Sequence, residues 1–267
     1  MKAIDFLNGV LERSPWVSRD NTVDRIIDGR PEKELRKLLV VWRCGPGAVE
    51  AAVRGGYDGI VTHEPTYYFH MDEVKQLAAM PGESPKKRYA TRKRRLILDN
   101  DLTIIRIHDS WDSREKIGIA ASWADSLGLK NLAYRSEPMS CECRYDIPPT
   151  TAGKLLETVR EAVKGYQAQE PFLFGDCDKE VARVGVGAGC IGDLECYIDM
   201  GCDIAIVCDD GISYWRDIAF ALDYGFPVIR VSHAASEEAG IQALSGWIKD
   251  EFGIETEYAR EAPCGNG

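Results

Sequence analysis

The sequence has no run of about 20 apolar residues, the length that a helix needs to cross a bilayer. Its first 16 residues show the apolar spacing of an amphipathic helix, but Asp5, Glu12 and Arg13 interrupt them, so the continuous core of a signal peptide is missing too. A net positive charge is also lacking, since the formal charge is -10. This disfavours general binding to a phosphate backbone. We therefore expect a soluble, cytoplasmic protein that binds no membrane and for which nucleic acid is not the default partner.

The nine cysteines lack a repeated CxxC spacing and form an odd set. A disulfide framework or a structural zinc knuckle is therefore not expected. Cys141 and Cys143 are the one close pair, and they alternate within an expected strand. We interpret the cysteines as small residues of a reduced fold.

Histidine is scarce, with four in the chain, yet three of the four are followed closely by carboxylates. These groups are His63 with Glu64, His108 with Asp109 and Asp112, and His233 with Glu237 and Glu238. Imidazole and carboxylate together are the ligands that zinc, manganese and iron take in proteins. The alternative is structural, because histidines at strand ends form hydrogen bonds and carboxylates there cap helices. On composition and position alone both interpretations stay open, and the fourth histidine, His70, is interpreted as structural.

Apolar runs of strand length alternate with segments of helical period. The expected strands are residues 35–43, 58–63, 102–109, 182–189, 203–210 and 226–233. The expected helices are residues 47–56, 85–100, 119–129, 194–201, 213–225 and 236–253. Such alternation is typical of an α/β fold with crossover connections and a largely parallel sheet covered on both faces.

The middle of the chain breaks this alternation. CECRYDIP at residues 141–148 predicts a strand, and a cap at Thr150 or Thr151 precedes a helix over residues 152–165. We expect two related α/β units with mixed, largely parallel sheets. The first would comprise residues 1–130 plus 228–267 and carry the histidine motifs, and the second residues 131–227.

Each of the three histidine motifs follows an expected strand. Ligands of open parallel sheets collect at the carboxyl ends of strands, where the turns diverge. His63, His108 and His233 all stand at such ends. His233 also precedes a helix, and a step of four residues would bring Glu237 to the same face.

The motifs THEP, HDSWD and SHAASEE, in this order, resemble those of the NIF3-like family, which has a dinuclear metal centre and is also called the GTP cyclohydrolase type 2 family. The resemblance covers nearly the whole chain. The length of the chain fits the short form of the family. It extends to residues 20–29, 118–129, 183–193 and 201–210.

By this resemblance the chain would bind two divalent ions (Mn, Fe, Zn or Mg) in a cleft between the two units. His63 would bind one ion and Glu64 the other, Asp112 would bridge them, and His233 with Glu237 would complete both ligand shells. The resemblance also implies a ring-like homo-oligomer, often hexameric.

Glu64 departs from the family pattern, which has a second histidine at this position. A carboxylate there adds negative charge and oxygen ligands, which should shift preference from zinc toward manganese, iron or magnesium. We expect metal binding to be retained, because the other ligand positions persist.

The expected activity is metal-dependent hydrolysis of a nucleotide-like or phosphorylated small molecule, of cyclohydrolase or phosphoesterase type. His108 is the candidate catalytic base, with an additional ligand role or the orientation of Asp112 as alternatives. A different class of function, metal binding or delivery without turnover, stays open.

Three further features allow two interpretations each. Gly187–Gly192 matches GxGxxG with Asp209 about 20 residues on, which suits a dinucleotide site or, instead, either tight packing or a phosphate-binding turn. Residues 67–69, Tyr-Tyr-Phe, could stack a heteroaromatic substrate or pack in the core. The basic run over residues 86–95 suits attraction of an anionic substrate, or a solvated helix face or subunit contact.

Overall fold

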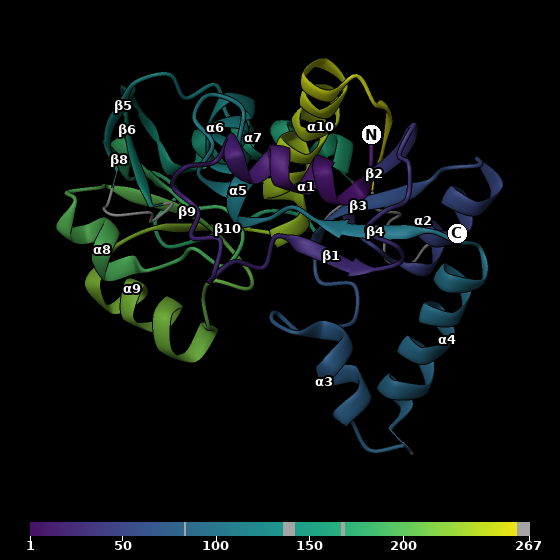
Figure 1. The fold of residues 1–267 in the computed structure, drawn as a ribbon. Helices are drawn as coiled ribbons and strands as arrows, with labels where there is room; N and C mark the ends of the chain where they lie inside the picture. Colours follow the sequence, from purple (N-terminus) through teal and green to yellow (C-terminus); the bar gives the residue numbers. More distant parts are fainter. Residues whose placement is uncertain (83, 136–141, 167–168, 261–267) are drawn as a thin grey trace. The chain divides into compact units, whose positions relative to one another are not determined.

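The computed structural model describes residues 1–82, 84–135, 142–166 and 169–260 (Figure 1). Cys141 lies outside these residues. Among the described residues, internal contacts form two compact units, residues 1–114 with 241–260, and residues 115–240. In the described part of the chain, no helix is both long and apolar enough to cross a membrane.

The first unit contains a five-stranded sheet in the order β1-β4-β3-β2-β11. The strands are β1 (Arg25–Asp28), β2 (Lys37–Arg43), β3 (Gly59–Glu64), β4 (Thr103–Arg106) and β11 (Glu255–Ala259). All neighbours are parallel except β1 and β4, which run antiparallel. The helices of this unit are α1 (Ala3–Glu12), α2 (Pro46–Arg54), α3 (Glu73–Ala79), α4 (Pro85–Asp99), the single turn α5 (Asp109–Asp112) and the second half of α10 (His233–Phe252).

The sheet of the first unit brings two histidine motifs to one edge. The central strands β3 and β4 pair in parallel, with Thr62 opposite Arg106, so their carboxyl ends meet and the residues that follow them are neighbours. Burial of β-branched and leucine side chains such as Leu39, Ile60 and Ile104 holds the helices on this sheet. Each such side chain contributes about 1.5–3 kcal/mol.

The second unit contains a six-stranded sheet in the order β5-β6-β8-β9-β10-β7. The strands are β5 (Leu132–Arg135), β6 (Cys143–Thr151), β7 (Phe172–Phe174), β8 (Glu180–Val186), β9 (Ile204–Cys208) and β10 (Val228–Val231). Strands β8, β9 and β10 are parallel, and the remaining pairs are antiparallel. Its helices are α6 (Ile119–Ser126), α7 (Ala152–Val163), α8 (Leu194–Asp199), α9 (Ala219–Tyr224) and the first half of α10, with a 3-10 turn at Lys164–Tyr166 and a π-helical turn at Tyr214–Ile218.

The α/β fold with two mixed sheets confirms the expected class, and each of the six strands expected from apolar runs is present. The Thr151 side chain caps α7 by accepting a hydrogen bond from the Lys154 N–H, as expected. The unit boundaries differ from those expected from the sequence. Strand β10 pairs with β9 and β7, so the segment that leads to His233 belongs to the second sheet, and residues 115–130 and 228–240 join the second unit.

Candidate metal centre

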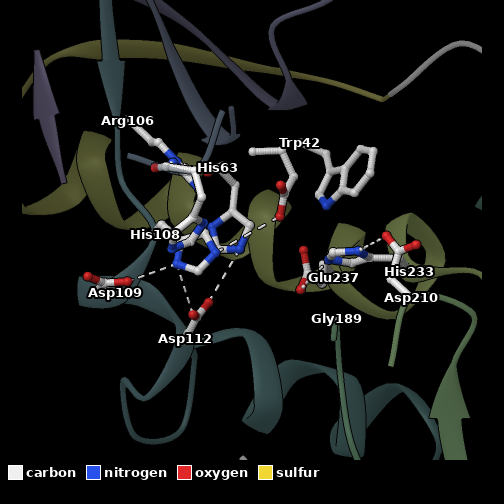
Figure 2. Close-up of polar contacts among 12 residues, drawn as sticks. Trp42, His63, Arg106, His108, Asp109, Asp112, Gly189, Asp210, His233 and Glu237 are labelled. Atoms are coloured by element: carbon white, nitrogen blue, oxygen red, sulfur yellow. Dashed lines mark hydrogen bonds and ion pairs between the residues drawn. The ribbon is translucent and has the colours of Figure 1, made fainter. Parts of the chain in front are cut away.

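His63 is fully buried at the end of β3, and the backbone fixes its ring (Figure 2). Its Nδ1 lies 3.0 Å from the carbonyl oxygen of Ile107. A carbonyl only accepts, so Nδ1 carries the proton and the lone pair is on Nε2. That Nε2 lies 3.3 Å from Oδ1 of Asp112. Within the described ranges, this buried Oδ1 receives no hydrogen bond.

His108 follows β4 and stacks on His63, with ring centroids 4.4 Å apart. Its Nδ1 lies 3.0 Å from Oδ1 of Asp109 and 3.1 Å from Oδ2 of Asp112. Its Nε2 lies 4.0 Å from Oε1 of Glu64. The four side chains at His63, Glu64, His108 and Asp112 will be called the first-unit set. In Figure 2 its two imidazoles and Asp112 point toward one another.

Two carboxylates that are not in this set hold His108 in place. Asp24 is buried and accepts the backbone N–H groups of His108, at 2.5 Å, and of Ser110, at 2.8 Å. Asp109 accepts the Thr22 hydroxyl at 2.7 Å. Burial raises the pKa of Asp24, whereas at Asp109 hydrogen bonds from His108 and Thr22 outweigh burial and lower the pKa well below its ordinary value. The turn after β4 is thus built around buried hydrogen bonds to carboxylates.

The second unit repeats this arrangement at the end of β10. Asp209 accepts the backbone N–H of His233 at 2.8 Å, and Oδ2 of Asp210 lies 2.8 Å from Nδ1 of the same ring. The Nε2 of His233 lies 3.1 Å from Oε1 of the buried Glu237, one helical turn further along α10. His233 and Glu237 will be called the second-unit set, and Figure 2 shows them beside Gly189.

The donor chemistry of both sets fits a divalent metal ion. One nitrogen of each ring is engaged by an oxygen acceptor, and the other nitrogen faces a carboxylate oxygen. Metal-bound histidines have this arrangement, with the second nitrogen donating to a carboxylate or a carbonyl. Ligand atoms of His63, Glu64 and His108 lie within 4.8 Å of one another, as do those of His108, Asp109 and Asp112.

A comparison with protein families then decides the relationship. The family model Duf34/NIF3 (NGG1p interacting factor 3) matches residues 4–263. The chain belongs to the NIF3 family. The resemblance seen in its histidine motifs is therefore confirmed over nearly the whole length.

Curated relatives carry the name "GTP cyclohydrolase 1 type 2 homolog". The Haemophilus influenzae protein of this name is 23% identical over 265 residues, covering 93% of this chain and 96% of that protein. The Escherichia coli K12 protein is 26% identical over 233 residues, covering 85% of each.

Solved structures of this fold match the chain end to end. A Staphylococcus aureus hypothetical protein has a TM-score of 0.80 at 15% identity, covering 100% of this chain and 99% of the other. The protein ybgI has a TM-score of 0.74 at 22% identity, covering 97% and 98%. Reduced HcgD from Methanocaldococcus jannaschii has a TM-score of 0.71 at 16% identity, covering 98% of each. These likenesses establish the NIF3 fold.

Within this NIF3 fold, the glycine-rich segment has packing roles. A Cβ at Gly187 would lie 2.3 Å from the Ile191 carbonyl oxygen, and one at Gly192 would lie 2.7 Å from the Gly211 carbonyl oxygen. The Asp209 carboxylate, which a dinucleotide site would need for a ribose, holds the backbone of His233 instead.

A cavity of about 320 Å³ beside this segment has a mostly acidic polar lining, made by Glu142, Asp193, Glu195 and Asp217 together with Arg216. Acidic walls would repel a pyrophosphate. The contacts therefore favour tight packing over dinucleotide binding.

The three aromatic residues in the loop after Glu64, residues 67–69, have different environments. Tyr67 is buried, and its hydroxyl donates to Asp28 at 2.8 Å. Phe69 packs against the core of the first unit, whereas Tyr68 is exposed. His70, interpreted as structural, has its ring edge-on to His108 at 5.7 Å, and burial lowers its pKa.

The buried Glu73 holds this loop by accepting the Tyr67 N–H at 2.5 Å. Burial raises the pKa of Glu73 from 4.5 to about 7, against the opposing effects of that hydrogen bond and of Arg106 and Lys93. The folded state therefore retains this proton at pH values where the unfolded chain has lost it. Ionising the buried carboxyl group therefore lowers the free energy of unfolding as pH rises. This loss is absent below the pKa of the unfolded chain and is complete above the pKa of the folded state.

We expect the free energy of unfolding of Glu73→Gln to rise relative to wild type as pH increases from 4.5 to about 7. The relative gain should reach up to about 3 kcal/mol. Urea unfolding of both proteins at about pH 5 and about pH 8 measures it. Glu50→Gln on the exposed face of α2 is the control, with no comparable trend expected. A pH-independent difference between Glu73→Gln and wild type would contradict the prediction.

Proposed function

We propose that this chain binds divalent metal ions through the first-unit and second-unit sets and uses them to hydrolyse a nucleotide-like or phosphorylated small molecule. One observation carries the proposal. The Nε2 atoms of His63, His108 and His233 lie 3.3, 4.0 and 3.1 Å from carboxylate oxygens. At His63 the Ile107 carbonyl places the proton on Nδ1, so Nε2 and Oδ1 of Asp112 are two acceptors that face each other, an arrangement that a bound cation would stabilise.

A divalent ion bound there would supply a water ionised near neutral pH and a positive charge for an anionic substrate. Asp112 suits the bridging role, because its two oxygens face different imidazoles, those of His63 and His108. Asp109 orients His108, so that its Nε2 is directed toward Glu64 and can serve as a ligand or accept a proton. Glu64 makes the first-unit set two imidazoles and two carboxylates, which favours manganese or iron over zinc.

The substrate class rests on the relatives. The name "GTP cyclohydrolase 1 type 2 homolog" on proteins 23% to 26% identical to this chain supports a nucleotide or a related phosphorylated compound. Such a substrate is anionic, which agrees with a reaction assisted by cations.

Elemental analysis of the full chain after reconstitution with manganese tests the binding. We expect two equivalents in wild type and a loss of bound metal in Asp112→Ala, since one residue faces both imidazoles of the first-unit set. Asp223→Ala, an exposed carboxylate on α9, is the control and should retain both equivalents. Glu64→His should retain metal with its preference moved toward zinc.

Turnover on a panel of nucleotides and phosphoesters tests the second step. Hydrolysis that depends on added metal and disappears in Asp112→Ala would support the hydrolase. Metal-loaded wild type without turnover on any member of the panel would instead favour a metal-binding protein without catalysis. Wild type that binds no divalent metal would remove both.

A further inference from the structure

Tyr68 has an unusual backbone conformation and a partly exposed ring. Its φ is 70°, in the left-handed region, where a bulky residue is rare and strained. Its side chain is 37% exposed, although the neighbouring Tyr67 is fully buried. Part of the ring therefore faces solvent, and part packs beside Lys86 and Lys93. Strain of this kind is common at ligand-binding positions.

Buried polar groups hold the loop around Tyr68 in this conformation. The ammonium of Lys93 donates to the carbonyl oxygens of Cys44, at 2.9 Å, and of Thr66. The buried Arg106 donates to the carbonyl oxygen of His70 at 2.7 Å. Both sides of Tyr68 are thus fixed by cations from α4 and β4, and the ring is presented before any ligand arrives.

Two lysine ammonium groups lie over the Tyr68 ring. The ammonium groups of Lys86 and Lys93 lie 5.6 and 5.2 Å from the ring centroid. Burial raises the pKa of Tyr68, as does Tyr89, and the positive charge of Arg43 at the end of β2 opposes them. The positive surface here is that of Lys86, because Lys93 is buried; in a chain of net charge -10 it favours anions locally.

The same surface is near the first-unit set along the chain. Arg43 pairs in register with Glu64 between β2 and β3. Tyr68 is four residues beyond Glu64, so their Cα atoms are at most about 15 Å apart. A ligand on Tyr68 would therefore lie within reach of the candidate metal ligands.

We propose that Tyr68, Lys86 and Arg43 form a binding site for a mononucleotide, with the base on the Tyr68 ring and the phosphate against Lys86 and Arg43. An aromatic side chain can stack any base, because every base has a π-face. Guanidinium and ammonium groups are the usual partners of phosphate oxygens. This deepens the proposed function, since it names the substrate class, but binding at this site requires no metal.

Isothermal titration of the full, chelator-treated chain with GMP, guanosine and inorganic phosphate tests the site. GMP should bind more tightly than either guanosine or phosphate, because guanosine lacks the phosphate group and inorganic phosphate lacks the base. Tyr68→Leu should weaken GMP binding by at least about fivefold, and Tyr68→Phe should retain it. Lys86→Gln should weaken GMP but not guanosine, and should reduce the dependence of the GMP affinity on salt.

Matched controls separate the site from general effects of charge and folding. Tyr224→Leu removes an exposed tyrosine of α9, and Lys75→Gln removes an exposed lysine of α3; neither should change GMP affinity. Thermal unfolding verifies that each variant is folded. Absence of GMP binding to wild type, equal affinity in Tyr68→Leu, or phosphate binding as tight as GMP would overturn the proposal. Because the titration is metal-free, none of these outcomes depends on the hydrolase.

Discussion

Replacing Asp24 by alanine is expected to lower the free energy of unfolding by about 3–5 kcal/mol. The carboxylate of Asp24 is buried and accepts the N–H groups of His108, at 2.5 Å, and Ser110, at 2.8 Å. Alanine would leave both donors in a buried turn without an acceptor, and water cannot replace it there at low cost. His108 would lose the contact that sets its backbone, so metal affinity should fall as well.

Urea unfolding of metal-free protein measures this effect without a contribution from bound ions. Asp203→Ala is the matched control, because Asp203 also accepts two backbone N–H groups, from Ala182 at 3.0 Å and Arg183 at 2.9 Å. Its side chain is 20% exposed, so water can take over those bonds and the loss should be about 1 kcal/mol. Equal losses in the free energy of unfolding of the two variants would contradict the prediction that burial makes the loss of Asp24 more costly.

The fold could be predicted where apolar patterning is continuous. Strands β2, β3, β4, β8, β9 and β10 are mostly buried and contain runs or repeats of β-branched or leucine residues, and all were expected. The sequence did not predict strands β1, β5, β7 and β11, because their apolar patterns are short or interrupted. Phe172 in β7 is exposed, and Glu255–Ala259 in β11 alternates charged residues. Such strands form because a neighbour supplies hydrogen bonds, which no local pattern encodes.

The positions of the candidate ligands could be predicted, but the groups distant in sequence that orient them could not. His108 and His233 stand at strand ends because parallel strands place their carboxyl ends at one edge. Asp24 is 84 residues from His108 in the sequence, and Asp210 is 23 residues from His233. A carboxylate with such a distant partner resembles any surface aspartate in the sequence. The burial that distinguishes Asp24 exists only in the folded chain.

The basic run on α4 shows that charged residues in a sequence are not always exposed to solvent. Its residues were interpreted as a solvated face or an anion-attracting one. The helix turns Lys93 into the interior, where it donates to backbone carbonyls, and burial lowers its pKa. Arg94 makes two hydrogen bonds to Asp28, at 2.7 and 3.1 Å. A helix that packs on a core turns one side of any long charged run toward the interior, and Lys93 is on that side.

Gly189→Ala is expected to weaken metal binding by the second-unit set about 10- to 100-fold. Gly189 has a φ of +63°, and an added Cβ would lie 2.4 Å from Oε1 of Glu237 and 3.1 Å from Nε2 of His233. These atoms are the ends of side chains, so the clash is relieved when the two candidate ligands move apart from their present positions. Stability should therefore fall only by the cost of the left-handed backbone, about 1–2 kcal/mol.

Gly225→Ala separates the backbone cost from the loss of ligand geometry. Gly225 has a φ of +73° at the end of α9, and a Cβ there would meet no atom within 4 Å. Both variants should lose similar stability in urea, whereas manganese titration followed by electron paramagnetic resonance should show weaker binding in Gly189→Ala alone. Unchanged manganese affinity in Gly189→Ala would mean that Glu237 and His233 do not bind the ion. Because this glycine lies against the ligand atoms without contributing one, the comparison tests the second-unit set without removing any candidate ligand.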